Sequence, residues 1–174
     1  PDGDNGIDNS FGKNLLPLIL GLSANWPTQV NNSLDQGHFN AMLKIYCLQD
    51  DGNATGLTTK VFGATDLGMD PAFDGTDVFP VAPEILGDPD DPESSTLIFE
   101  NSSVMGDTYD SGPGELFVLT IPIAYMGQEA SLKLTLHSAQ LTMEFDEDRH
   151  SATGGVIAGV LNTEELIDQV KKVA

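Results

Sequence analysis

The alternation of apolar residues between 132 and 145 reverses its phase halfway, and this reversal limits the possible fold more than any other feature. Even positions come first and odd positions follow: Leu132, Leu134 and Leu136, then Leu141, Met143 and Phe145. Period-two alternation indicates a β-strand with one buried face. A change of phase moves the apolar side chains to the opposite face unless the strand is bulged or sharply bent. We therefore expect a bulge or bend within 137–140, as in curved sandwiches and barrels.

Other patterns predict further strands and three helices. Strands are expected at 38–48, 57–62, 96–100 and 115–126, and helices at 11–22, at 28–37 and from 163 onward. Pro17 suits a first helical turn, Gly37 suits a helix end, and Asn162 suits an N-cap with Glu165 three residues later. The segment 115–126 is apolar on both faces at its start, which favours a central strand, and Pro122 favours a bulge or an exposed position near its end.

These elements predict a single α+β domain over residues 1–174. The expected architecture is β-rich, a mainly antiparallel sandwich or curved sheet with helices at the N- and C-termini. The chain contains 18 glycines and 10 prolines, more than a helical bundle tolerates. Cys47 lies in an apolar stretch and is expected to be buried.

The charge balance excludes several classes of function. The chain has 27 acidic and 7 basic residues, a formal net charge of −20. A nucleic-acid binder needs clustered Lys and Arg, and docking on anionic lipid needs basic residues too. No run approaches the roughly 18 apolar residues of a membrane-spanning segment. Cys47 has no partner in the chain, so neither an internal disulfide nor a cysteine-based zinc site is possible.

Aspartates near the start of the chain form the sharpest local pattern. Asp2, Asp4 and Asp8 alternate with glycine and asparagine, and calcium accepts six to eight oxygen ligands in loose geometry. The stretch resembles the aspartate-rich calcium loops of thrombospondin type 3 repeats and of secreted bacterial linkers. It departs from an EF-hand because Gly6 and Lys13 stand where that loop needs ligands. The alternative is a flexible acidic arm over 1–10, in which Asp8 or Asn9 caps the first helix.

A second candidate calcium site lies in the acidic, proline-rich segment 64–95. We expect this segment to be a long surface loop with little regular structure. Its candidate ligands are Asp66, Asp70, Asp74 and Asp77. A solvated acidic loop accounts for the same residues. Bound cations would also relieve the repulsion among the many acidic side chains.

Catalytic patterns are weak. Glu144 and Asp146 share one face of a strand, and a glycoside hydrolase uses two carboxylates about 5–9.5 Å apart, but exposed strand residues show the same spacing without any role. The histidines lack the spacing of a helical zinc site, and the sequence contains no nucleophile elbow, P-loop or dinucleotide-binding fingerprint. We therefore expect a protein that is not an enzyme.

Three segments carry a resemblance to a known group of proteins. They are GIDNSFGKNLLPLILGL at 6–22, QVNNSLDQGHFNAMLKI at 29–45 and ATGGVIAGVLNTEEL at 152–166. Together they resemble uncharacterised secreted or lipid-anchored proteins of myxobacterial type. The resemblance implies an extracytoplasmic location (secreted, periplasmic or cell surface) and assigns no reaction.

Three classes of function remain. The first is a non-catalytic secreted or cell-surface module, calcium-stabilised, that binds a protein or carbohydrate or assembles with itself through an unpaired edge strand. The second is a carrier of an apolar ligand such as lipid, because apolar residues occupy both faces of several strands. The third is a hydrolase that uses Glu144 and Asp146. We favour the first class.

Overall fold

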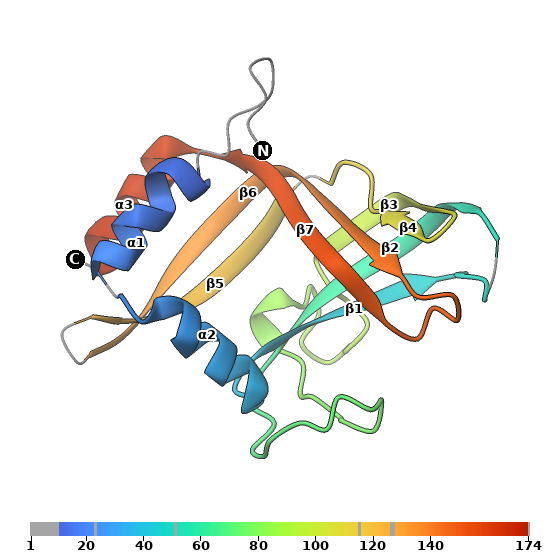
Figure 1. The fold of residues 1–174 in the computed structure, drawn as a ribbon, viewed down its shortest axis with the longest axis horizontal. Coiled ribbons are helices and arrows are strands. Elements are labelled where there is room, and N and C mark those ends of the chain that lie inside the picture. The colour runs from blue at the N-terminus through green and yellow to red at the C-terminus, as the bar shows by residue number, and fades with distance from the viewer. Residues whose placement is uncertain (1–10, 23, 51, 115, 126–127, 174) are drawn as a thin grey trace.

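The computed structural model describes residues 11–22, 24–50, 52–114, 116–125 and 128–173. Within them the chain forms an antiparallel sheet of seven strands and three α-helices (Figure 1). The strands are β1 (Asn40–Tyr46), β2 (Ala54–Ala64), β3 (Leu97–Met105), β4 (Thr108–Asp110), β5 (Leu116–Tyr125), β6 (Gln128–Phe145) and β7 (Ala152–Leu161). The helical segments are η1 (Phe11–Leu15), α1 (Leu16–Leu22), α2 (Trp26–Asp35), η2 (Pro83–Ile85) and α3 (Thr163–Val173). The predicted α+β, β-rich fold with helices towards both ends is confirmed.

Strand β6 organises the sheet. Its first half pairs with β5, its second half pairs with β4 on the same side, and β7 pairs along its other side. The pairing of β6 with β7 shifts register between His137 and Gln140, and Ser138 has φ 50°. This is the β-bulge that the reversed alternation predicts within 137–140.

Strand β6 contributes buried residues to three hydrophobic clusters, before, at and after the bulge. Before it, Leu132 and Leu134 pack against Leu15 and Ile19, next to side chains of α2 and α3. After it, Leu141 packs with the buried residues of β2, β3 and β4. The middle cluster joins five residues of β2, β3, β5 and β6: Val61, Leu97, Phe99, Phe117 and Ala139. Strands that are not neighbours in the sheet share this cluster, so the sheet curves around its core.

The helices cover one end of the curved sheet. Helices α1 and α3 pack side by side against β6 there, and α2 lies beside β5 (Figure 1). Asn162 caps α3 as predicted, since its Oδ1 accepts hydrogen bonds from the backbone N–H groups of Glu164 (2.9 Å) and Glu165 (3.4 Å). Pro17 lies in the first turn of α1, also as predicted. No helix among the described residues is long and apolar enough to cross a membrane.

Three local expectations differ from the structure. Strand β5 is predicted to be central from its sequence, but it pairs with β6 and ends the strand order of the described sheet, so it is an edge strand. Proline is tolerated at 122 because a residue of an edge strand need not donate an N–H to a second neighbour. Helix α2 begins at Trp26, two residues before the predicted start at 28, because Pro27 fits the first turn of a helix. No side chain caps this helix start. Cys47 is exposed and has φ 63°, because it lies just beyond β1 at the turn into β2.

Candidate binding surface

The acidic loop between β2 and β3 has little regular structure, as predicted. It contains the short turn η2 and two isolated bridges, Ala64 to Val81 and Leu86 to Ser95. The loop begins beside α2, where Gly37 has φ 72°; a Cβ there would lie 2.9 Å from the Met69 carbonyl oxygen. Glycine at this position therefore permits close contact between the helix end and the loop.

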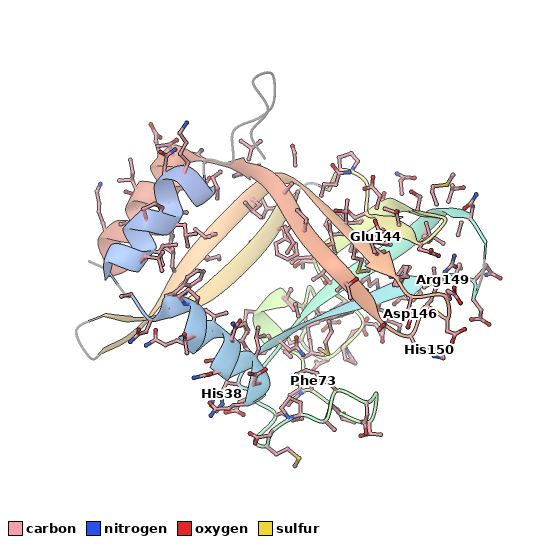
Figure 2. All side chains as sticks on the ribbon, viewed as in Figure 1. His38, Phe73, Glu144, Asp146, Arg149 and His150 are labelled. Atoms are coloured by element: carbon pink, nitrogen blue, oxygen red, sulfur yellow. The ribbon has the colours of Figure 1, made fainter. Side chains whose placement is uncertain are left out.

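Three of the four aspartates predicted in this loop accept hydrogen bonds from nearby groups. Asp66 accepts one from the Gly68 N–H and lies 3.2 Å from His38 Nδ1; the Gly68 N–H, followed by His38, lowers the pKa of Asp66. Asp74 accepts hydrogen bonds from the hydroxyl and the N–H of Thr76, which lower its pKa. Asp77 accepts hydrogen bonds from the N–H groups of Ala72 and Phe73. These carboxylates stabilise local turns of the loop, Asp66 at 66–68 and both Asp74 and Asp77 within 72–77. Figure 2 shows Phe73 in this loop.

The predicted calcium sites are not formed as ligand clusters in the part of the chain that the structure covers. There, no group of three His, Cys, Asp or Glu side chains is arranged to hold a metal ion. Asp66 and Asp70 do share an open hollow of about 290 Å³ with His38 and Met69. Asp2, Asp4 and Asp8 lie outside the described residues, so calcium binding stays a prediction.

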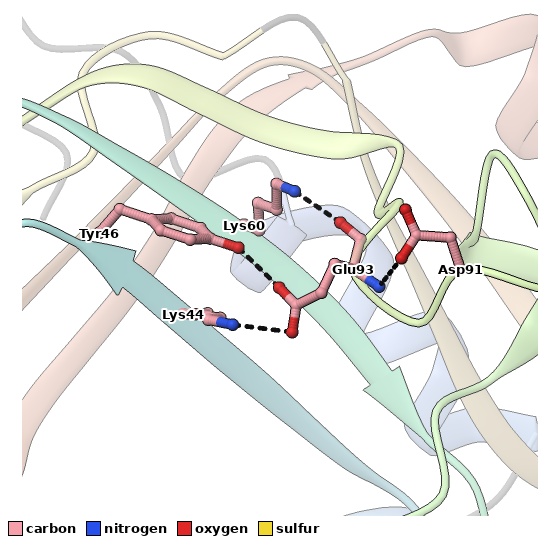
Figure 3. A network of polar contacts seen from close by, with 5 residues as sticks. All are labelled: Lys44, Tyr46, Lys60, Asp91 and Glu93. Carbon is pink, nitrogen blue, oxygen red and sulfur yellow. Dashed lines mark hydrogen bonds and ion pairs between the residues drawn. The ribbon is translucent and has the colours of Figure 1, made fainter.

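A network of polar contacts fixes the far end of the acidic loop to the sheet (Figure 3). The Glu93 carboxylate accepts hydrogen bonds from Lys44 Nζ on β1 and from the Tyr46 hydroxyl, both at 2.7 Å. Lys60 Nζ on β2 donates to the Glu93 carbonyl oxygen at 2.5 Å. Both ammonium groups lie over the Tyr46 ring, at 5.1 and 5.4 Å from its centroid. The bond from Lys44, followed by that from Tyr46, lowers the pKa of Glu93.

The two carboxylates proposed for hydrolysis have different local partners: that of Glu144 lies on β4, and those of Asp146 lie in the turn between β6 and β7. Glu144 accepts a hydrogen bond from the Thr108 hydroxyl at 3.0 Å. Asp146 accepts hydrogen bonds from the Ser151 hydroxyl and the His150 N–H, and the Ser151 hydroxyl is the main cause of its lowered pKa. A carboxylic acid that acts as a general acid needs a raised pKa. The surroundings of Asp146 lower its pKa and therefore do not suit that role.

Arg149 links this turn to a distant part of the chain. Its guanidinium donates hydrogen bonds to the carbonyl oxygens of Gln49 and Gly52, in the turn between β1 and β2. Figure 2 shows Arg149 beside Asp146 and His150 at this end of the molecule. This contact therefore joins the β1–β2 and β6–β7 hairpins, which lie at opposite edges of the described sheet.

The hollows favour neither a lipid carrier nor a buried active site. The larger one, of about 320 Å³, lies between β6 and α3 and is open to solvent. Its lining includes Lys133, Glu165, Asp168 and Lys172. Three of its ten lining residues are leucines and the other seven are polar or charged, whereas a site for an apolar ligand is lined mainly by hydrophobic and aromatic side chains.

The most distinctive surface is the edge strand β7. Within the described residues it pairs with β6 and with no other strand, and nine of its ten residues are exposed. Val156, Ile157 and Val160 are exposed by 55%, 41% and 65%. The strand contains no charged residue and no proline. Exposed edges of this composition are sites where another strand can pair.

Two bulges, one in β7 and one in β6, change the register between these strands. Gly154, with φ 62°, is the extra residue where the register shifts opposite 142–144. Gly159 passes close over the β6 bulge, since a Cβ there would lie 3.0 Å from the Leu136 Cβ and 3.2 Å from the His137 carbonyl oxygen. From Gly155 onward the strand is extended, and its outer edge is unpaired among the described residues.

The other edge strands of the described sheet carry features that discourage pairing. Strand β1 includes Lys44, and β5 includes Pro122 and contacts α2. Lysine, proline and a covering helix are common ways in which proteins protect sheet edges. Strand β7 contains neither lysine nor proline.

Sequence reasoning missed β7 because three glycines interrupt its apolar pattern. The available signal was the uncharged run from Ser151 to Thr163 in a strongly acidic chain.

Comparison of the chain with protein-family models, with curated proteins and with solved structures finds no match.

Proposed function

We propose that this chain is a non-catalytic, extracytoplasmic structural module, secreted or on the cell surface, that binds a protein partner by adding a strand to the edge of β7. The exposed, uncharged and unprotected edge of β7 carries the proposal. Main-chain hydrogen bonds would supply affinity, and the exposed Val156 and Val160 would supply apolar contacts.

Two further observations support this class. The carboxylates that a hydrolase would need accept hydrogen bonds from neighbouring turn and strand residues. The resemblance of three segments to secreted or lipid-anchored proteins and the acidic composition favour a place outside the cytoplasm.

Cell fractionation tests both parts of the proposal. We expect protease added to intact producing cells to digest the protein or, for a secreted form, the medium to contain it in sedimentable complexes. Val156→Lys with Val160→Lys should release the chain from those complexes, because charged side chains along a strand edge oppose strand addition. Val78→Lys is the matched control, since Val78 is 83% exposed on the acidic loop. A cytoplasmic protein, or complexes unaffected by the β7 changes, would contradict the proposal.

Calcium stabilisation is a separate part of the proposal. Asp2, Asp4 and Asp8, or Asp66, Asp70, Asp74 and Asp77, would supply the oxygen ligands. A ligand that binds the folded state raises stability by about 2.7 kcal/mol at a hundredfold excess over Kd. For a chain of this size the unfolding midpoint should rise by about 5–10 °C in calcium, compared with sodium at equal ionic strength. An unchanged midpoint would remove calcium from the proposal.

A further inference from the structure

We infer that the strand added to β7 is β7 of a second copy of this chain, antiparallel and related by a twofold axis. This inference rests on the proposed function, because it names the partner of the same edge. A twofold axis makes one surface serve both partners and closes the assembly at two copies. The paired strands would join two seven-stranded sheets into one.

Strand β7 itself carries no charge that would oppose pairing with a second copy. The chain as a whole has a net charge of −20, yet none of its 27 acidic residues lies in β7. A basic partner would be attracted to acidic loops, whereas an uncharged apolar edge matches another uncharged apolar edge. The second copy brings such an edge with the same spacing of Val156, Ala158 and Val160.

The flanks of the strand predict an unusual response to salt. Glu147 and Asp148 precede β7, and Glu164 and Glu165 follow it. In an antiparallel pair, the start of one strand lies beside the end of the other, so acidic groups meet at both ends. Their repulsion is screened by salt, with a Debye length of about 8 Å at 0.15 M. Self-pairing should therefore tighten as salt is added, whereas binding of a basic strand would weaken.

Sedimentation velocity of the purified chain tests the inference. We expect a monomer–dimer equilibrium whose Kd falls as sodium chloride is raised from low salt to about 0.15 M. Val156→Lys with Val160→Lys should raise Kd by about tenfold or more. Val78→Lys should leave Kd unchanged. Thermal unfolding of each variant checks that it is folded.

Cysteine cross-linking tests the antiparallel arrangement and does not depend on the lysine variants. Single cysteines would be placed by Thr153→Cys, Val156→Cys, Ala158→Cys or Val160→Cys in a Cys47→Ser background. Around a twofold axis, the distance between identical residues grows by about 7 Å for each step from the axis, twice the rise per residue. Disulfide formation should therefore peak at one or two neighbouring positions and fall on both sides.

Each contrary result has a defined meaning. A monomer at every concentration and salt, a dimer insensitive to the β7 lysines, or equal cross-linking at all four positions would overturn self-pairing. If the purified chain is monomeric but the β7 lysines still release it from complexes on cells, the edge binds a different protein. In that case the proposed function stands and the second copy is excluded.

Discussion

Tyr109 places a hydroxyl in the core, where it bonds other buried side chains. Its side chain is fully buried, and the hydroxyl contacts Thr59 Oγ1 at 2.7 Å and Ser102 Oγ at 3.2 Å. Burial raises the pKa of Tyr109. Ser111 extends the buried hydroxyl groups to β6 by accepting a hydrogen bond from the Leu141 N–H. This network fixes β2, β3, β4 and β6 relative to one another.

Tyr109→Phe should destabilise the protein by about 1–3 kcal/mol, because it leaves the Thr59 hydroxyl buried without this partner. Urea unfolding monitored by circular dichroism measures the effect. Adding Thr59→Val should recover part of the loss, since an apolar pair costs less than one unpaired hydroxyl. A double variant with the summed loss of the two single variants would contradict this account.

At the scale of elements, strands with several alternating apolar residues were predictable and strands without such a pattern were not. The reversed phase within 132–145 located the β6 bulge, and Asn162 located α3, because each signal is local. Strand β4 has three residues, too few for a pattern, and the glycines of β7 hide its alternation. The role of β5 as an edge depended on pairing across the sheet, which no local pattern reports.

The candidate site was less predictable than the fold. Asp66, Asp74 and Asp77 are irregularly spaced candidates for a cation loop, and these side chains bond backbone N–H groups within a few residues. Short polar side chains favour such local bonds in turns, and sequence spacing does not distinguish the two uses. The edge of β7 was missed because openness is a property of the whole sheet.

The attachment of the acidic loop by Glu93 gives a prediction about that element. Glu93→Ala should speed hydrogen exchange across 86–95, because it removes the bonds from Lys44 and Tyr46. Global stability should change little, since the pair is exposed and screened by solvent. Glu84→Ala, in the same loop, is the control. Exchange that rises equally in both variants would show that Glu93 does not anchor the loop.

For the whole molecule, the lowered pKa values predict loss of stability in acid. Asp146, Glu93, Asp66 and Asp74 all have pKa values below those of the unfolded chain. Unfolded carboxyls bind protons near pH 4, before these folded ones do, so their contribution is present above about pH 4 and is lost as pH falls through the folded values. The urea midpoint should fall across this range at fixed salt, and less steeply in Asp146→Asn. Equal slopes would contradict the assignment for Asp146.

The bonds from Arg149 also have a kinetic consequence. They join positions 100 and 97 residues apart in the sequence, to Gln49 and Gly52. Closing so long a loop costs chain entropy, so contacts of this kind tend to form after the folding transition state. Arg149→Met should therefore speed unfolding in stopped-flow experiments and leave the refolding rate unchanged. A slower refolding rate would instead place the joining of the two turns in the folding nucleus, so one side chain reports when the curved sheet closes.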